Sequence, residues 1–385
     1  MDDNWDSKLL RDTYLEIDLD RLAMNVDVIR RHVGEHVDLC AVIKANGYGM
    51  GAVDIAPTLI QNGATYLAVA NLPEAMELRK RNSSWPIWVM GHTPDRYLKV
   101  AIENDITLTV FTLSQAETIQ EIARLTGKIQ PIQIKVDTGF NRLGFKITEM
   151  DIKSISSIFE LANIEVVGVF SHLALASYDE DTKQLELLLG LKAKLELDGA
   201  KETVKYHVCD SISAISYPDF RLNMVRVGAA LFGAKSYRYP DFPIETIAKF
   251  KTRISHLKNI EPGEGVSYDY KWRASRNSVV ATLPFGYADG YPRNMTGQGE
   301  VVIEGRRFPI IGVICMDQCM VDVTELKGAH VGQEVTIFGS DAISIDELSQ
   351  KAGTNKNEIL SRLMQRVPRV YMKGGSIDHI RNDLL

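Results

Sequence analysis

Eight short apolar runs, most of them followed by a segment with helical spacing, lie within residues 38–233 and constrain the fold more than any other feature. The runs are rich in apolar and β-branched residues, which is typical of buried strands. They span residues 38–43, 65–70, 87–90, 107–111, 132–136, 166–171, 206–209 and 224–231. Eight strand and helix units in a row predict an α/β fold, a closed parallel (β/α)8 barrel of the TIM type.

The segments between these runs carry helix signals. Pro73 stands at a first-turn position before residues 74–79, and Ser114 is expected to cap a helix over 115–125. An open, doubly wound sheet is the alternative arrangement, and it would more often show one glycine-rich dinucleotide turn. The sequence offers no such turn, so the barrel is favoured.

After about Pro243 the pattern changes to short alternating segments with turn signals between them, at 279–283, 301–303 and 335–337. This pattern predicts a mostly antiparallel β domain. Residues 13–18 alternate in the same way and are expected to pair with that domain, before a helix over 22–32. We therefore expect an N-terminal extension (1–12), a barrel (13–243) and a β domain (244–385).

Composition limits the functional class. The 385 residues are 45% hydrophobic and 24% charged, as in ordinary globular proteins. The formal net charge of -6 argues against nucleic acid or an anionic membrane as the main partner. No apolar run has the length of a membrane span, and the first six residues are acidic where a signal peptide would be basic. We expect a cytoplasmic protein.

The four cysteines argue against a disulfide framework, because most of them lie in apolar, strand-like runs. Cys315 and Cys319 resemble half of a metal site, but no second pair with suitable spacing exists. We expect reduced thiols and no metal.

Polar residues follow several of the apolar runs, and in a barrel they gather at the carboxyl ends of the strands, where active sites form. Lys44 is the first polar side chain after the run 38–43. A lysine at the edge of a core loses solvation, which lowers its pKa and frees its amine as a nucleophile or Schiff-base partner. The alternative is a lysine that extends to solvent. The others in this set are Arg142, His172, Asp210, Ser211, Arg226, Gly228 and Ala229.

The loops after the last two strands offer a phosphate site. They contain the Ser211 hydroxyl and the backbone amides of Gly228 and Ala229. A phosphate site combined with a lysine is what pyridoxal 5'-phosphate requires. Most folds that bind this cofactor place a carboxylate on the pyridine nitrogen, whereas Arg226 would leave it unprotonated and suit proton exchange at Cα. A structural pairing of Arg226 with an acidic residue is the alternative.

Five motifs, in order, resemble those of the alanine racemases. Residues 42–51 (VIKANGYGMG) are similar to the family's cofactor motif, with Gly47 and Met50 where alanine and histidine are more usual. Residues 135–144 (KVDTGFNRLG) resemble its substrate-arginine motif, with Phe140 and Asn141 in place of the commoner Met-Gly. The other three motifs are 263–268 (GEGVSY), 286–290 (GYADG) and 315–318 (CMDQ), and the resemblance runs from about Thr13 to Tyr371.

The resemblance implies a pyridoxal phosphate enzyme that interconverts L- and D-alanine, a homodimer in which each site is completed by the partner's β domain. By that analogy Lys44 carries the cofactor and is the base on one face of Cα, while the partner's Tyr268 is the base on the other. His172, with Arg226 behind it, would assist this tyrosine. D-alanine of this origin supplies peptidoglycan precursors.

The same analogy assigns the remaining site residues. Arg142 should hold the cofactor's phenolic oxygen and the substrate carboxylate, which the backbone of the partner's Met316 also binds. Tyr48 should reach the phosphate, and Lys135 matches a position that is often carbamylated, which would make it an anion able to orient Arg142. His207, Tyr287 and Asp317 match the pattern too. We assign Tyr287 to the substrate pocket, with a structural role as the alternative for all three.

One departure from the family concerns the substrate. Where the family commonly has Thr-Ile-Asn-Tyr-Glu, this chain has Thr-Asn-Lys-Asn-Glu at 354–358, so Asn357 replaces a tyrosine that lines the pocket. The smaller amide leaves room and adds a hydrogen-bonding group, which would favour a hydroxymethyl side chain. Serine is therefore a candidate substrate beside or instead of alanine. The alternative is that the exchange of tyrosine for Asn357 only removes one hydrogen bond to the cofactor phosphate.

Two other classes share parts of this pattern. Decarboxylases of basic amino acids share the barrel and β domain, but they are expected to have a glutamate where Arg226 stands. Single-domain barrels that carry the cofactor without turnover lack a β domain, so the block 244–385 counts against that class.

Overall fold

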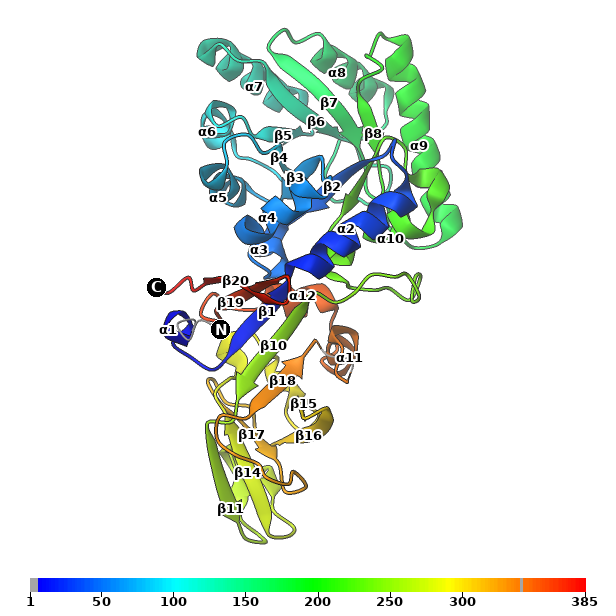
Figure 1. The fold of residues 1–385 in the computed structure, drawn as a ribbon. Coiled ribbons are helices and arrows are strands. Elements are labelled where there is room, and N and C mark those ends of the chain that lie inside the picture. Colours follow the sequence, from blue (N-terminus) through cyan, green and yellow to red (C-terminus); the bar gives the residue numbers. More distant parts are fainter. Residues whose placement is uncertain (1–5, 340–341) are drawn as a thin grey trace.

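The computed structural model describes residues 6–339 and 342–385, which form a barrel and an elongated sheet domain (Figure 1). Within these residues eight strands make the barrel sheet, and all eight expected strands are confirmed. Neighbouring strands pair in parallel in the order β8-β7-β6-β5-β4-β3-β2-β9. Their bounds are β2 (Asp38–Val42), β3 (Tyr66–Val69), β4 (Ile87–Val89), β5 (Thr107–Val110), β6 (Gln130–Lys135), β7 (Ile164–Phe170), β8 (Lys205–His207) and β9 (Met224–Val227).

The ring of strands is nearly closed. β2 pairs with β9, and two backbone hydrogen bonds join the segments of β8 and β9. The Asn223 amide donates to the Tyr206 carbonyl at 3.2 Å, and the Arg226 amide donates to the Cys209 carbonyl at 3.0 Å. The open, doubly wound sheet is therefore wrong for this chain, because its first and last strands would lie apart.

Helices connect the barrel strands and lie around them (Figure 1). Asn71 caps the helix that contains Pro73, and Asp18 caps the helix that leads into the barrel. The helices are α2 (Leu19–Val33), α3 (Lys44–Tyr48), α4 (Ala52–Gln61), α5 (Leu72–Arg81), α6 (Leu98–Glu103), α7 (Leu113–Thr126), α8 (Glu149–Phe159), α9 (Tyr178–Leu197) and α10 (Ser211–Ser216).

Two local predictions are wrong. Thr112, not Ser114, caps α7, because Thr112 has extended backbone and its hydroxyl accepts from the Gln115 amide at 3.2 Å. The eighth strand stops at Val227 and does not continue to residue 231. The chain turns at Gly228 into the short 3-10 helix η3 (Ala229–Phe232), whose apolar residues are buried without being part of the sheet.

The second domain is built on a ten-stranded sheet whose pairs are antiparallel, apart from β1 with β19. β1, formed by residues expected to pair with this domain, lies between β10 and β19. The strands are β1 (Tyr14–Asp18), β10 (Ala248–Arg253), β11 (His256–Ile260), β14 (Ser278–Leu283), β15 (Glu300–Ile303), β16 (Arg306–Ile311), β17 (Cys319–Asp322), β18 (Glu334–Phe338), β19 (Arg369–Lys373) and β20 (Ser376–Arg381).

Short elements complete the second domain. They are α1 (Asp6–Leu9), α11 (Ile345–Lys351), α12 (Lys356–Ser361) and the two-stranded ribbon of β12 (Gly265–Val266) and β13 (Trp272–Arg273). In Figure 1, α12 lies where the two lobes meet. No helix among the described residues is long and apolar enough to cross a membrane.

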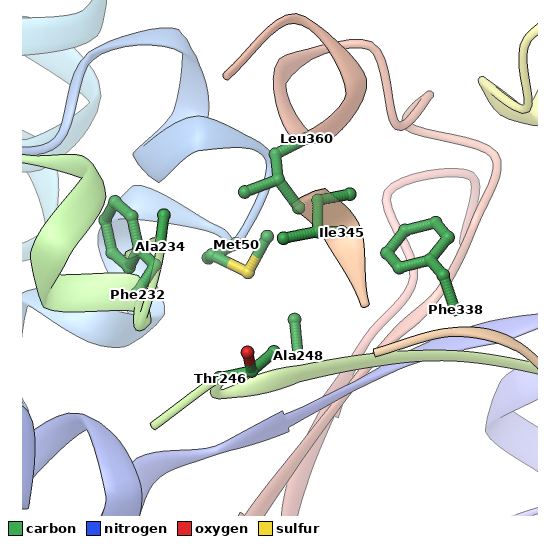
Figure 2. Close-up of a pocket in the computed structure, with 8 residues that line it drawn as sticks. All are labelled: Met50, Phe232, Ala234, Thr246, Ala248, Phe338, Ile345 and Leu360. Atoms are coloured by element: carbon green, nitrogen blue, oxygen red, sulfur yellow. The ribbon is translucent and has the colours of Figure 1, made fainter. Parts of the chain in front are cut away.

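Met50 packs at this junction, where one hydrophobic core continues from the barrel into the second domain. Figure 2 shows its thioether between Phe232 on the barrel side and Ile345 and Leu360 on the other. The gap that these side chains leave is only about 10 Å³, so it holds no ligand. A methionine fits a dry contact of this kind better than the histidine usual in the resembling motif, because it has no polar atom that needs a strong partner.

Candidate active site

A cavity of about 520 Å³ opens at the carboxyl ends of the barrel strands. Its size suits a small cofactor with a substrate. Ten of the predicted site residues line it: Lys44, Tyr48, Lys135, Arg142, His172, Ser211, Arg226, Gly228, Ala229 and Asn357. The first nine come from the loops and ends of barrel strands, and Asn357 comes from α12 of the second domain. Three predicted residues, Tyr268, Met316 and Tyr287, are not among those that line the cavity.

Lys44 follows β2 and starts a turn of unusual handedness. The backbone of Ala45, Asn46 and Gly47 is left-handed, with φ of 53°, 53° and 64°. This conformation costs roughly 1–2 kcal/mol for each residue with a Cβ. The Glu74 carboxylate offsets part of this cost, because its two oxygens accept from the amides of Ala45 and Ala70 at 2.8 Å each. The turn holds Lys44 at the edge of the cavity.

The electrostatic surroundings of Lys44 favour its neutral amine. Burial lowers the pKa of Lys44, the nearby Arg142 lowers it further, and Glu74 opposes the shift. A neutral amine is the form that reacts with an aldehyde. The expectation of a solvent-extended lysine does not describe this side chain, which lines the cavity.

The phosphate cradle predicted from the sequence consists of Tyr48, Ser211, Gly228 and Ala229, and all four residues line the cavity. The Gly228 amide lies 3.0 Å from the Ser211 hydroxyl oxygen, and a Cβ added to Gly228 would lie 2.6 Å from the Tyr48 hydroxyl. Burial raises the pKa of Tyr48 to about 12, and the Asp210 carboxylate adds to the effect, so its hydroxyl stays a donor. Hydroxyls and amides with space for an anion fit the phosphate of pyridoxal 5'-phosphate.

Arg226 lies buried on β9 at the floor of the cavity. Its guanidinium donates to the carbonyls of Ser171 and Val208, at 2.7 and 3.0 Å, and to His207 Nδ1 at 2.5 Å. Within the described residues its partners are thus carbonyls and ring nitrogens, not a carboxylate. The structural ion pair considered for Arg226 is therefore wrong, and the group fits an unprotonated pyridine nitrogen.

His172 is neutral near pH 7. Burial lowers the pKa of His172 to about 3, and the cations Arg226, Arg142, Lys135 and Lys44 contribute in that order. Its Nδ1 lies 3.4 Å from Arg226 Nη2, which can only donate, so the ring proton is assigned to Nε2. His172 therefore presents an N–H donor on the side away from Arg226.

Lys135 and Arg142 belong to one rigid corner of the cavity. Asp137 fixes the loop between them, because its carboxylate accepts from the amides of Gly139 and Asn141 and from Lys146 Nζ. Lys135 is 3% exposed and donates to the Val136 carbonyl at 2.5 Å. Burial lowers the pKa of Lys135 to about 7, helped by Arg226.

Arg142 is exposed in this chain, and its guanidinium lies 4.5 Å from the centre of the Phe140 ring. The Phe140 ring in turn meets the His172 ring edge-on, with 5.0 Å between ring centres. The aromatic ring thus holds the guanidinium of Arg142 at the cavity wall.

Tyr268, Met316 and Tyr287 lie in the second domain, and 66%, 52% and 38% of their surfaces are exposed. Their loops are tied together. Ser267, beside Tyr268, donates to the Val313 carbonyl at 2.7 Å, and the amide of Tyr287 donates to the Cys315 carbonyl at 3.2 Å. The loops that carry these three exposed side chains are therefore joined, and none of the three lines the cavity of its own chain.

Lys356 also lines the cavity, and the sequence analysis assigned it no role. The sequence does carry a signal for it, because Lys356 and Asn357 belong to the same segment, 354–358, that differs from the common family motif. His207 and Gln133 are further supports: His207 Nε2 lies 3.0 Å from Gln133 Oε1, which orients the ring toward Arg226. Asp317, on the exposed surface, pairs with Arg366 at 2.7 Å.

Comparisons with known proteins agree with this arrangement. The protein-family model of the alanine racemase N-terminal domain matches residues 17–236, and the family model of the C-terminal domain matches residues 247–371. An alanine racemase of Clostridium novyi is 38% identical and covers 97% of this chain and 99% of its own. An alanine racemase structure from Clostridium difficile 630 has a TM-score of 0.94 at 36% identity, and covers 97% of this chain and 99% of its own.

An alanine racemase from Bartonella henselae was solved with covalently bound pyridoxal phosphate; it is 28% identical, has a TM-score of 0.83, and covers 94% of this chain and 99% of its own. Both domain models together span most of the residues described above. The chain therefore belongs to the alanine racemase family, a family of pyridoxal phosphate-dependent isomerases.

Proposed function

We propose that this alanine racemase interconverts L- and D-alanine with two bases, Lys44 of one chain and the partner's Tyr268. The observation that carries the proposal is the composition of the cavity. It combines a lysine whose pKa is lowered, a phosphate cradle and a buried arginine that donates to carbonyls and a histidine ring. When bound, the cofactor supplies the electron sink that acidifies the α-proton of the substrate.

Lys44 would hold the cofactor and exchange a proton with Cα on one face. Its lowered pKa increases the fraction of neutral amine near pH 7, which is the form that accepts a proton. Arg226 would face the pyridine nitrogen as a donor and keep it unprotonated. A weak electron sink of this kind suits proton exchange and disfavours the loss of carbon dioxide, which speaks against the decarboxylase alternative.

The second base would come from the other subunit of a head-to-tail homodimer. Tyr268 is exposed on its own chain and does not line that chain's cavity, which supports a role across an interface. The Nε2–H of His172 could donate to the tyrosine oxygen and stabilise its phenolate, since the ring is neutral and Arg226 occupies Nδ1. A base on each face of Cα is what inversion of configuration requires.

Arg142 and the backbone of the partner's Met316 would bind the substrate carboxylate, with the partner's Tyr287 at the edge of the pocket. We propose that Lys135 is carbamylated. Its neutral amine would form a C–N bond to carbon dioxide and release one proton, leaving an anion next to Arg142. A pKa of about 7 supports this reaction at neutral pH, because about half of the amine is then unprotonated.

The same proposal includes a domain boundary between residues 243 and 244, a cytoplasmic location and a role in supplying D-alanine for peptidoglycan. The boundary is supported by the two matched domain models, of which one ends at residue 236 and the other begins at residue 247.

A second candidate function is serine racemisation, which rests on Asn357 at the cavity wall. The test is chiral analysis of L-alanine and, separately, L-serine after incubation with the purified chain and pyridoxal phosphate, with Lys44→Ala as control. D-alanine formed much faster than D-serine supports the alanine reaction as the main one. Comparable or faster D-serine makes this a serine or broad-specificity racemase, and no product in either assay refutes the proposed function.

A further inference from the structure

Lys356 is the first residue of α12, so it reaches the barrel cavity from the second domain. Its ammonium lies 2.7 Å from Asp346 Oδ1, at the start of α11. Only 19% of the Lys356 side chain is exposed, compared with 43% for its partner Asp346. Within residues 6–339 and 342–385, the lysine is thus held in the cavity wall by one carboxylate, which itself faces solvent.

Tyr239 connects this ion pair with the cradle residues. Tyr239 lines the same cavity and donates to the Ala234 carbonyl at 3.2 Å, directly after η3 and the cradle residues Gly228 and Ala229. Burial raises the pKa of Tyr239, and the carboxylates of Asp210 and Asp346 add to the shift. Asp346, the partner of Lys356, therefore acts on the same tyrosine as Asp210, which also acts on Tyr48 of the cradle.

The charge balance of the cavity leaves a place for Lys356. Among the other cations that line the cavity, Arg226 is occupied by two carbonyls and His207, and Lys135 donates to the Val136 carbonyl. Lys44 and Arg142 are assigned above to the aldehyde of the cofactor and to the substrate carboxylate. The phosphate cradle itself offers hydroxyls and amides, with the negative Asp210 beside them. A phosphate dianion in this cradle would be repelled by the negative charge of Asp210. A nearby cation is therefore needed to balance the two negative groups.

We propose that Lys356 is the cation that binds the cofactor phosphate, so that the second domain of the same chain takes part in holding the cofactor. Asp346 holds the lysine in the cavity wall and competes with the phosphate for it. The inference rests on the phosphate cradle proposed above. It follows that removing the lysine and removing its carboxylate have opposite effects on affinity.

The test compares two aldehydes on the full-length chain freed of cofactor. Pyridoxal 5'-phosphate and pyridoxal, which lacks the phosphate, are titrated while the absorbance of the bound aldehyde is recorded. Lys356→Gln should bind the phosphorylated aldehyde about tenfold more weakly and pyridoxal unchanged. Lys356→Arg should restore most of the affinity, and Asp346→Asn should bind as tightly as the unchanged chain or more tightly.

Lys351→Gln is the matched control, because Lys351 is a paired lysine of α11 whose partners are Glu300 and Glu347. It should leave both affinities unchanged. Added salt should weaken the phosphorylated aldehyde more steeply in the unchanged chain than in Lys356→Gln. Each variant is compared by thermal unfolding, so that a misfolded variant is recognised.

Two results would overturn the inference: equal loss of both aldehydes in Lys356→Gln, which indicates a structural role, or no loss of either. Failure of the proposed function looks different. In that case the unchanged chain binds neither aldehyde covalently, and its titrations are the same as those of Lys44→Ala.

Discussion

Arg226 Nη1 donates to His207 Nδ1 across 2.5 Å, in the buried floor of the cavity. Because arginine can only donate, this nitrogen of His207 must accept, and the other donates to Gln133. Burial lowers the pKa of His207 well below its ordinary value, and the charge of Arg226 lowers it further. The ring therefore stays neutral, with Nδ1 as acceptor and Nε2 as donor. The orientation of Arg226 therefore depends on acceptors at fixed places: His207 Nδ1, the carbonyls of Ser171 and Val208 and, at 3.4 Å, His172 Nδ1.

We first predict that Arg226→Lys lowers kcat by at least about tenfold, although the charge is kept. A single ammonium cannot span the Ser171 and Val208 carbonyls and the His207 nitrogen. The measurement is racemisation rate together with the absorbance spectrum of the bound cofactor. Arg221→Lys is the control, since Arg221 also bonds to carbonyls, of Ala214 and His32, and does not line the cavity. Equal rates in both variants would contradict the role of Arg226.

A second prediction concerns the shared site. Lys44→Ala and Tyr268→Phe should each be nearly inactive as purified homodimers. When the two are mixed and allowed to exchange subunits, activity should return to roughly a quarter of the unchanged enzyme, because each hybrid dimer has one intact site. Activity that stays at the level of the separate variants would place both bases on one chain.

A third prediction follows from Lys135, whose buried amine has a pKa of about 7. Added bicarbonate should increase kcat/KM near pH 8, where the amine is mostly neutral, and have less effect near pH 6, where it is protonated. Carbon-13 NMR with labelled bicarbonate should show a carbamate signal that is absent in Lys135→Met. Lys128→Met is the control, because that lysine lies in the α7–β6 connection and pairs with Asp105. A bicarbonate response that persists in Lys135→Met would contradict carbamylation.

The fourth prediction reverses the departure at position 357. Asn357→Tyr should lower the ratio of serine to alanine turnover by about tenfold, since a bulkier wall leaves less room for a hydroxymethyl group. The ratio of the two kcat/KM values is the measurement, and Asn355→Ser, a cap exchange on the same helix, is the control. An unchanged ratio would indicate that Asn357 does not select the substrate.

A fifth prediction concerns stability and pH. His379 stacks on Tyr371, with 4.3 Å between ring centres, and its Nε2 lies 3.2 Å from Asp54 Oδ1. The hydrogen bond to Asp54 raises the pKa of His379 despite partial burial. The contribution to stability is therefore full below the unfolded value of about 6.5 and is lost as pH rises through the higher folded value.

Urea unfolding of the unchanged chain and of His379→Gln checks this. The difference between their unfolding free energies should be largest near pH 6 and smallest near pH 9. His330→Gln, at an exposed histidine that contacts the Gly328 carbonyl, should show no such trend. A difference that does not change with pH would show that His379 stabilises by packing alone.

The amino-acid sequence by itself determined the elements and most of the chemistry of this protein. Period-two and helical patterns are local, so the eight barrel strands and the change of pattern after Pro243 could be recognised without coordinates. The order of the strands then places Lys44, His172 and Arg226 at one end, because the carboxyl ends of parallel strands meet on one face. Local sequence does not determine where a helix begins, since Thr112 and Ser114 are both good caps and only the backbone geometry selects one.

Only the tertiary structure decided which distant segments meet. Lys356 reaches the barrel cavity from α12, more than a hundred residues after Gly228, and no local pattern encodes that both line one cavity. The same holds for Tyr268, whose motif gives its identity but not its distance from the cavity of its own chain. Contacts of this kind depend on how two packed domains are oriented, which arises from the buried junction around Met50 and not from any single stretch of sequence.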